Sequence, residues 1–178
     1  MTGTAPAFFV RTARWDDVAT LPALEQSAGE LFRTVPELAH VADGDNHSEE
    51  RYRAFVAHGW SRVAVDEDGE LCGFLCAEPF GAEVHVWEIG VRLDRQRRGI
   101  GRRLLDLTID TARHRHMASI TLTTFGDLAW NAPFYERMGF RRLAPDDAGA
   151  RLRGILDREA EAGLPRDRRC AMRLALSQ

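Results

Sequence analysis

The chain has 178 residues, a length that suits one domain with a full hydrophobic core. Its formal net charge is −3, which argues against a general nucleic-acid-binding protein, because such a protein needs a basic face overall. Three cysteines without a CxxC pair suit reduced thiols. No apolar run approaches the length of a membrane span, and Met1–Ala7 lacks the apolar core of a signal peptide, so we expect a soluble cytoplasmic protein.

The first part of the sequence predicts a strand, two helices and a hairpin. Asp16 or Asp17 can cap the first helix, and Ser48 can cap the second. Asp68-Gly69 is a strong hairpin signal between two apolar runs. In chain order we expect a strand from Phe8–Val10, a helix to about Leu31, a loop over 33–47, a helix over Glu49–His58, and strands over Trp60–Val65 and Leu71–Ala77.

The second part predicts alternating strands and helices. The run Ser119–Phe125 is β-branched and typical of a buried strand, and Gly139 can cap the end of a short helix. Alternation from Cys170 to Leu176 predicts a last strand with one buried face. In chain order we expect strand Glu83–Arg92, a helix over about Gly99–Arg115, strand Ser119–Phe125, helix Asn131–Met138, strand Phe140–Leu143, a helix opened by Asp146 or Asp147, and the last strand. This order indicates one α/β domain.

A basic, glycine-containing loop is the most informative local feature. Residues 96–101 read Gln-Arg-Arg-Gly-Ile-Gly, between an expected strand and the start of an expected helix. Glycines let a backbone approach an anion closely, and the orphan N–H groups and dipole of a helix N-terminus favour negative charge. We interpret this loop as a site for a small phosphate-bearing ligand, the alternative being a solvated helix start. The arginines that cluster here are Arg92, Arg95, Arg97, Arg98, Arg102 and Arg103.

Two motifs carry a resemblance to the GNAT (Gcn5-related N-acetyltransferase) family. Gln96–Gly101 resembles its Q/R-x-x-G-x-G/A acyl-CoA loop, and Phe134–Phe140 resembles its F-Y-x-x-x-G-F helix-to-strand signature. The resemblance is close over roughly 84–143 and looser outside that range. It implies a single α/β domain over 1–178, with a mixed central sheet that contains two splayed strands and is flanked by helices.

The resemblance implies acetyl-CoA as the acyl-donor substrate, held between strands 83–92 and 119–125. Backbone groups near Ile89 and Val91 would hold the pantetheine arm, and a backbone N–H near Ile89 would stabilise the oxyanion of direct acetyl transfer. Backbone N–H groups of Arg97–Arg102 would hold the pyrophosphate. The expected donor-binding residues are Ile89, Gly90, Val91, Gln96, Arg97, Arg98, Gly99, Ile100, Gly101, Arg102, Asn131 and Tyr135.

Acetyl transfer needs a proton acceptor for the amine and a proton donor for the leaving thiolate. By the resemblance, Tyr135 is the expected general acid, since a phenol is a reasonable donor to a thiolate; the alternative is a tyrosine that packs its helix. His85 is a candidate base or proton relay, or an ordinary sheet histidine. Glu88, beside an expected bulge, is a further catalytic candidate, or else a structural carboxylate.

Two features bear on ligands more weakly. Asn131 lies four residues before Tyr135, where the family often has its CoA-contacting asparagine seven before, so it is equally well a helix N-cap. The acceptor pocket implied by the resemblance offers Glu30, Phe32 and Trp87, together with the acidic loop Asp43–Asp45, which would suit a cationic amine. Metal binding is not expected.

The leading hypothesis is therefore an acetyl-CoA-dependent N-acetyltransferase that acts on a small-molecule primary amine. A protein N-terminus or lysine is an alternative acceptor, and a non-catalytic acyl-CoA-binding module is a hypothesis from another class. No nucleic-acid or membrane partner is expected. The C-terminal strand could pair across a homodimer, although nothing in it requires one.

Overall fold

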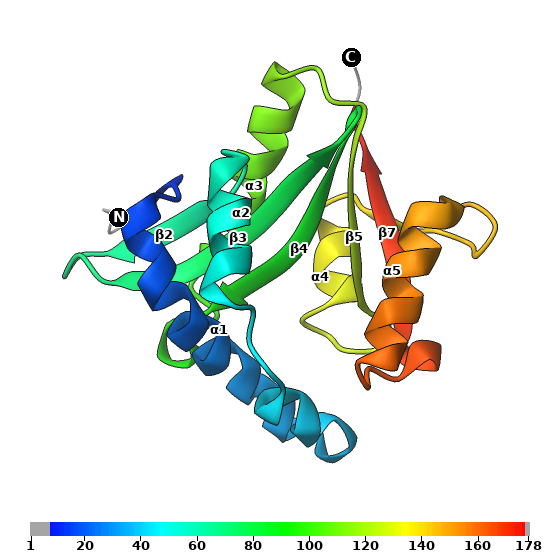
Figure 1. Ribbon diagram of the computed structural model, residues 1–178, viewed down its shortest axis with the longest axis horizontal. Coiled ribbons are helices and arrows are strands. Elements are labelled where there is room, and N and C mark those ends of the chain that lie inside the picture. Colours follow the sequence, from blue (N-terminus) through cyan, green and yellow to red (C-terminus); the bar gives the residue numbers. More distant parts are fainter. Residues whose placement is uncertain (1–7, 177–178) are drawn as a thin grey trace, which may run out of the picture. The chain divides into compact units, whose positions relative to one another are not determined.

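A computed structural model describes residues 8–176, so the amino-terminal segment Met1–Ala7 lies outside the described residues. The chain forms two compact units. The first holds the described residues up to Glu78 together with Glu88–Thr108, and the second holds Pro79–Trp87 and the residues from Ile109 onward. Figure 1 shows that strand β4 (Glu83–Val91) is one continuous element, to which both units contribute. The expectation of a single domain over 1–178 stays a prediction.

The first unit is built on antiparallel strands. Strand β2 (Arg62–Asp66) pairs with β1 (Phe8–Thr12) on one side and with β3 (Leu71–Phe80) on the other, with a register shift between Ala64 and Val65. Helices α1 (Leu21–Gly29) and α2 (Glu49–Ala57) cover one face of these strands (Figure 1). The fully buried side chains of this unit include Leu21, Leu38, Tyr52, Phe55, Phe74 and Leu75.

The second unit contains a parallel pair of strands. The first four residues of β4 pair in parallel with β5 (Ser119–Phe125), in the register Glu83↔Ser119 to Val86↔Leu122. Beyond β5 lie β7 (Arg169–Ala175) and β6 (Arg141–Arg142), both antiparallel. The strand order β1-β2-β3-β4-β5-β7-β6 confirms the expected mixed sheet.

Three further helices and several 3₁₀ turns complete the fold. Helix α5 (Gly149–Glu161) packs an apolar cluster that includes Leu152 and Ile155 against Ala171 of β7. None of the described helices is both long and apolar enough to cross a bilayer. The remaining elements are α3 (Ile100–His114), α4 (Ala132–Arg137), and the 3₁₀ segments η1 (Trp15–Thr20), η2 (Glu30–Thr34), η3 (Pro36–Asp43), η4 (Leu93–Arg95) and η5 (Arg166–Arg168).

The amino-terminal elements differ in detail from the expectation. The first helix does not run from Asp16 or Asp17 to Leu31; a 3₁₀ segment precedes α1, which begins at Leu21 because Pro22 fits only in a first helical turn. The expected loop over 33–47 contains the whole of η3 and the end of η2. The Ser48 cap is confirmed, since its Oγ accepts the N–H of Arg51 at 3.2 Å.

The carboxyl-terminal elements also differ. Helix α5 opens at Gly149 rather than at Asp146 or Asp147, because Gly149 takes a left-handed φ of 70° and the residues before it form turns. Strand β7 was expected to bury one face, but Ala171 and Met172 are both buried, so helices or strands cover it on both sides there.

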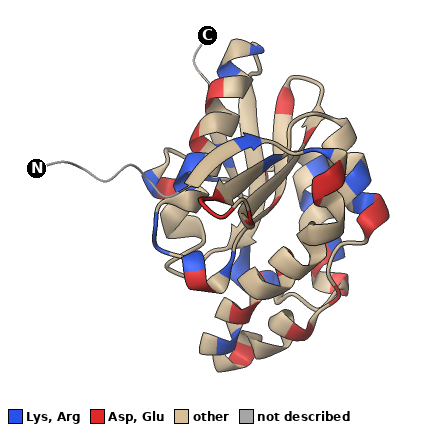
Figure 2. Cartoon of the chain, turned by 90° about the vertical axis from the view of Figure 1, so that its left-hand side faces the viewer, with Lys and Arg blue, Asp and Glu red and all other residues tan. Residues whose placement is uncertain are grey.

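Charges of both signs are interspersed over the elements (Figure 2). All 24 of the Lys and Arg residues are arginine, as the printed sequence shows. Arginine offers a rigid fork of donors that matches carboxylate and phosphate geometry. Much of the positive charge is therefore held in pairs with acidic side chains.

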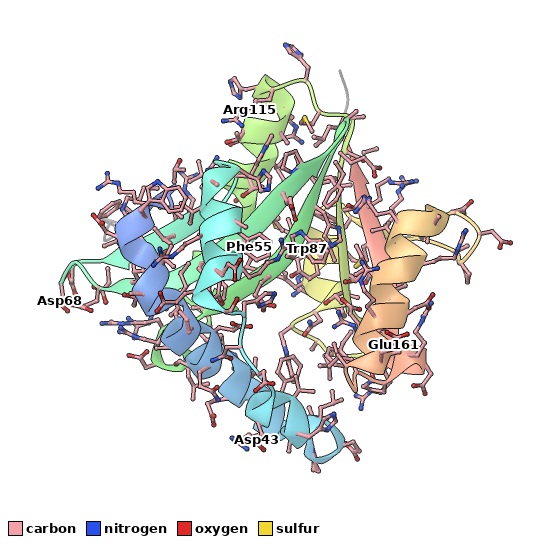
Figure 3. The ribbon with its side chains drawn as sticks, viewed as in Figure 1. Asp43, Phe55, Asp68, Trp87, Arg115 and Glu161 are labelled. Atoms are coloured by element: carbon pink, nitrogen blue, oxygen red, sulfur yellow. The ribbon has the colours of Figure 1, made fainter. Side chains whose placement is uncertain are left out.

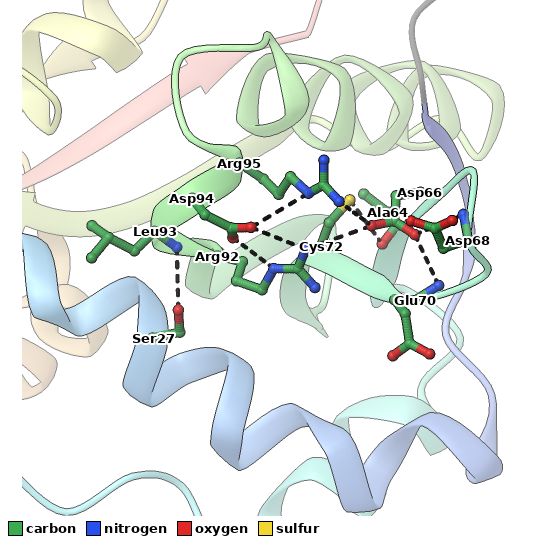
Figure 4. A network of polar contacts seen from close by, with 10 residues as sticks. All are labelled: Ser27, Ala64, Asp66, Asp68, Glu70, Cys72, Arg92, Leu93, Asp94 and Arg95. Carbon is green, nitrogen blue, oxygen red and sulfur yellow. Dashed lines mark hydrogen bonds and ion pairs between the residues drawn. The ribbon is translucent and has the colours of Figure 1, made fainter.

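Asp66 is the buried centre of one such network (Figure 4). Its Oδ1 accepts the backbone N–H groups of Asp68 and Glu70 in the β2–β3 turn, at 3.2 and 3.0 Å. Its Oδ2 lies 3.1 Å from Arg95 and 3.6 Å from Arg92. One carboxylate thus fixes the hairpin turn to the segment that leads from β4 towards α3.

We predict that Asp66→Ala lowers the free energy of unfolding by about 2–3 kcal/mol, because it leaves two backbone donors without their acceptor and removes one of the two carboxylates that hold Arg92 and Arg95. Urea denaturation of the variant and the wild type measures the difference. Asp68→Ala removes an exposed carboxylate from the same turn and should change stability by less than about 0.5 kcal/mol. Equal effects of the two substitutions would contradict the assigned role of Asp66.

Candidate active site

The loop after β4 has the backbone of an anion site. Arg97 and Gly99 both take left-handed conformations, with φ of 60° and 80°. The N–H of Arg103 bonds to the carbonyl of Gly99 at 2.9 Å, so the amides of 99–102 precede the hydrogen-bond ladder of α3. Such amides, at the positive end of a 15-residue helix, favour phosphate.

The arginines around this loop divide into two groups. Arg92 and Arg95 are held by Asp66 and Asp94, with Arg92 Nε 2.7 Å from an oxygen of Asp94. These two side chains therefore brace the loop, contrary to the expectation that the whole cluster serves a ligand. Arg102 lies 3.6 Å from Asp106 and is largely exposed. In the part of the chain that the structure describes, no ion pair holds the side chains of Arg97, Arg98 and Arg103.

The end of β4 is packed closely to the start of α3. A Cβ atom on Gly101 would stand 3.8 Å from Val91 and 4.0 Å from Ile89, in ordinary contact. Gly90 has no such room, because a Cβ there would collide with the ring of Phe74. Gln96 ties the loop back to the strand, since its side-chain amide donates to the carbonyl of Val91 at 3.2 Å. The loop geometry thus depends on this strand end.

In the second unit, α4 carries Tyr135 in an aromatic setting. Tyr135 is buried and its ring contacts Phe134 and Phe140, with centroid distances of 5.1 and 5.8 Å. Asn131 stands at the N-cap position, but its side chain makes no cap bond. Its Nδ2 donates instead to Thr124 at 2.8 Å, and its buried Oδ1 has no hydrogen-bond partner among the described residues. Asn131 therefore does not cap α4 through its side chain. Its Oδ1 can still accept a hydrogen bond.

His85 is a buried, neutral imidazole. Its side chain is 0% exposed, and Nδ1 lies 3.0 Å from Thr121 Oγ1, while Nε2 has no partner in residues 8–176. Burial, and then the charge of Arg151, lowers the pKa of His85 to about 3. A group with that pKa is a poor proton acceptor near neutral pH, so this environment favours the alternative of a structural histidine.

Trp87 belongs to the same aromatic group. Its ring lies 4.6 Å from that of His85 and 6.3 Å from that of Phe80, and it packs against the α5 cluster (Figure 3). Arg151 stacks on Phe80 at 4.6 Å. This environment occupies much of the Trp87 side chain. Its expected contact with an acceptor stays a prediction.

Two of the acidic residues expected at the acceptor pocket, Glu30 and Asp43, are paired with one arginine. Arg33 lies 2.8 Å from Glu30 and 2.6 Å from Asp43, on the segments η2 and η3 beside Phe32. Figure 3 labels Asp43 at this position. The hydrogen bonds from Arg33 lower the pKa of Asp43. These two carboxylates therefore have little unpaired charge to offer a cationic amine.

A second acidic group, which the sequence did not reveal, lies in the first unit. It consists of Glu25 of α1, His47 before α2 and Glu88 of β4. One carboxylate oxygen of each glutamate and one ring nitrogen of the histidine lie within 4.8 Å of one another. Glu25 Oε1 is 3.0 Å from His47 Nδ1, and Glu25 Oε2 accepts the Tyr52 hydroxyl at 2.5 Å. The three residues are far apart in sequence and share no motif, so only the fold could bring them together.

These contacts shift the protonation of the group. The hydrogen bond and charge of Glu25 outweigh burial and raise the pKa of His47. Burial works to raise the pKa of Glu25, but hydrogen bonds from His47 and Tyr52 leave it lowered. Burial, and then Glu25, raises the pKa of Tyr52. The group thus pairs an ionised carboxylate with an imidazole that binds a proton more tightly than usual.

We predict that His85 makes the fold sensitive to mild acid. Its pKa is about 3 when folded and near 6.5 when unfolded, so the unfolded chain binds the proton more readily and stability falls as pH drops below about 6.5. The wild type should lose about 1–2 kcal/mol more than His85→Gln between pH 7 and pH 5. Urea titrations at both pH values measure this. His114→Gln, an exposed control, should lose as much as the wild type; an equal loss in His85→Gln would contradict the assignment.

Comparisons with known proteins agree with this arrangement. A profile described as the acetyltransferase (GNAT) family matches residues 21–140. The chain is 32% identical over 136 residues to a mycothiol acetyltransferase of Clavibacter michiganensis subsp. michiganensis, over 74% of this chain and 42% of that protein. It is 28% identical over 120 residues to a 5-NmdU N-acetyltransferase of Pseudomonas phage PaMx11, over 66% of this chain and 83% of that protein.

A solved structure shows the same fold. The ribosomal-protein-S18-alanine N-acetyltransferase from Escherichia coli aligns with a TM-score of 0.68 at 19% identity, over 96% of this chain and 95% of that one. The chain spans less than half the length of the mycothiol acetyltransferase it matches. The matched range 21–140 contains both the 96–101 loop and Tyr135. The chain therefore belongs to the GNAT family of acetyltransferases.

Proposed function

We propose that this protein transfers an acetyl group from acetyl-CoA to a small-molecule primary amine. The observation that carries the proposal is the loop 97–102, where two left-handed residues lead into the helix-start amides of 99–102, beside Arg97 and Arg98, which have no ion-pair partner among the described residues. Family membership supports the same donor. Two relatives are named mycothiol acetyltransferase and 5-NmdU N-acetyltransferase, and neither name refers to a protein acceptor, which supports a small-molecule acceptor.

The donor would be held by backbone and guanidinium groups. The amides of 99–102 suit the pyrophosphate, and Arg97 and Arg98 add charge without a competing acidic partner among the described residues. Backbone groups of Ile89 and Val91, at the end of β4, suit the pantetheine arm. The buried Oδ1 of Asn131 suits a donor N–H, since a buried acceptor without a partner costs free energy until it is bonded.

The reaction is a direct transfer. The neutral amine attacks the thioester carbonyl, and a backbone N–H near Ile89 stabilises the developing oxyanion. The carbon–sulfur bond then breaks, and the Tyr135 hydroxyl gives its proton to the departing thiolate. The aromatic surroundings of Tyr135 hold the ring in one orientation for that step. No covalent enzyme intermediate is required.

The acceptor is proposed to be cationic before it reacts. Glu25 and Glu88 supply two carboxylates beside His47, whereas Glu30 and Asp43 are paired with Arg33. A protonated amine is attracted by the two carboxylates of the first group, whereas Arg33 already holds both carboxylates of the second.

Titration calorimetry and a thiol-release assay test the function. Acetyl-CoA should bind with micromolar affinity, and a dephosphorylated analogue more weakly. An amine panel of spermidine, tyramine, glucosamine, Nα-acetyl-lysine and 5-NmdU then tests turnover by release of free CoA thiol. Acetyl-CoA binding without acetylation of any amine would favour an acyl-CoA-binding module instead.

The first variant prediction concerns the phosphate loop. Gly101→Asp places a negative charge at the start of α3 and should abolish measurable acetyl-CoA binding by electrostatic repulsion. The fold should be kept, because an acidic residue is favourable in a first helical turn. Gly101→Ala is the matched control, since its Cβ has room and no charge. Calorimetry gives both affinities; an unchanged affinity of Gly101→Asp would refute the placement of the pyrophosphate.

The second variant prediction concerns the general acid. Tyr135→Phe should lower kcat by more than about tenfold and leave acetyl-CoA affinity unchanged, because it removes one proton donor and no packing surface. Steady-state kinetics with the best amine and calorimetry with acetyl-CoA measure the two quantities. Phe134→Leu tests the packing separately, because it removes a ring contact of Tyr135 and keeps the hydroxyl. Full activity of Tyr135→Phe would remove this hydroxyl from the mechanism.

A further inference from the structure

We propose that His47 is the group that takes the proton from the acceptor ammonium, and that Glu25 and Tyr52 are positioning residues for it. The inference rests on the proposed function, because a proton acceptor has a role only if an amine is acetylated. It differs from the sequence-based expectation, which considered His85 and Glu88 for this step. Nothing in the motifs of the chain assigns a role to His47.

The geometry is that of a carboxylate-oriented imidazole. Glu25 binds His47 twice, because Oε2 accepts the backbone N–H at 2.9 Å and Oε1 lies 3.0 Å from Nδ1. An ionised carboxylate only accepts, so this contact fixes the proton on Nδ1 and leaves the lone pair on Nε2. The ring is therefore held in the tautomer that can accept a proton from outside the pair.

Tyr52 in turn holds the carboxylate of Glu25. Tyr52 is 0% exposed and its hydroxyl donates to Glu25 Oε2, so the carboxylate cannot rotate without losing a buried hydrogen bond. The ring of Tyr52 also lies 5.7 Å from that of His47, at an angle of 53°. The imidazole is thus fixed by its partner and by an aromatic neighbour.

The imidazole of His47 is accessible to a ligand, and the charged groups around it favour binding of a proton. The side chain of His47 is 30% exposed and that of Glu25 15%, so the imidazole can reach a ligand while its partner stays shielded. Four titratable groups face His47, from three elements: Glu25 of α1, Arg51 and Tyr52 of α2, and Glu88 of β4. The two carboxylates raise the pKa of His47 and Arg51 opposes them, with a net rise.

The position of Glu88 in β4 links the Glu25–His47–Glu88 group to the proposed place of the acetyl donor. Glu88 shares the group with His47 and directly precedes Ile89, whose backbone N–H is proposed to hold the acetyl carbonyl. An amine that contacts Glu88 would therefore lie next to the carbon it must attack. Glu88 is proposed to hold the ammonium, and His47 to remove its proton.

The proton count balances over the reaction. The ammonium gives one proton to His47 Nε2, and the resulting amine adds to the thioester carbonyl to form the new carbon–nitrogen bond. The tetrahedral adduct loses its second nitrogen-bound proton to water, the carbon–sulfur bond breaks, and the departing thiolate takes a proton from Tyr135, which water then restores to the phenol. After release of the amide, His47 returns its proton to solvent through its exposed edge.

The experiment measures the pH dependence of kcat. With the best amine of the panel, kcat of the wild type should rise with pH through the raised pKa of His47, because only neutral imidazole accepts a proton. His47→Gln should lower kcat at least about 100-fold, remove that rise and leave acetyl-CoA affinity unchanged. Glu25→Gln should move the rise to lower pH, because the carboxylate no longer stabilises the imidazolium.

Two controls separate a catalytic role from a structural one. His114→Gln changes an exposed histidine of α3 and should leave both kcat and its pH profile as in the wild type. NMR titration of the histidine rings, without any amine, should show His47 with a raised pKa that falls in Glu25→Gln. A divalent metal at the same three side chains would instead make activity sensitive to EDTA, which would overturn the assignment.

The two levels of proposal fail differently. A His47→Gln variant with kcat within about twofold of the wild type and the same pH profile overturns the role of His47 while the acetyltransferase function stands. If the wild type acetylates no amine, the proposed function fails. The NMR titration then still decides whether Glu25 sets the pKa of His47.

Discussion

The carboxylate of Asp66 is the interaction on which the geometry of the loop after β4 depends. It is buried in the first unit and gathers two backbone donors of the β2–β3 turn and two arginines of the segment after β4. Because those arginines are anchored, η4 ends at a fixed point and the left-handed residues Arg97 and Gly99 follow it. A flexible connection would give the amides of α3 no fixed direction. The phosphate-type site is therefore a product of hairpin packing as much as of its own glycines.

Local signals predicted the elements well, and long-range contacts decided the rest. The strand Ser119–Phe125 was predicted with its observed bounds, because a β-branched run between two breakers leaves little choice. The start of α5 was displaced to Gly149 because the left-handed turn there is set by the chain around it, which periodicity does not register. The GNAT membership followed from two motifs whose spacing reflects backbone requirements, and the family match confirms it.

The candidate site could be predicted only where its residues are neighbours in sequence. The loop 96–101 is contiguous, so its residue types alone are enough to predict an anion site there. The histidines show the opposite case. His85 stands in a strand near an expected reaction centre, yet burial lowers its pKa to about 3, whereas His47 in a loop has its pKa raised by a carboxylate 22 positions away in sequence. The pKa values of the two imidazoles differ because of burial and of neighbouring groups, and both depend on tertiary packing.

The arginine-only character of the basic residues has a consequence for the chain itself. A reactive thioester acylates lysine side chains slowly even without catalysis, because a small fraction of each amine is unprotonated at neutral pH. The guanidinium group stays charged and offers no such nucleophile. With all 24 basic positions occupied by arginine, the loop proposed to bind the pyrophosphate carries its positive charge on side chains that are inert towards a thioester. The sequence thereby avoids automodification on lysine, and any acetyl-lysine formed in a reaction mixture must belong to another molecule.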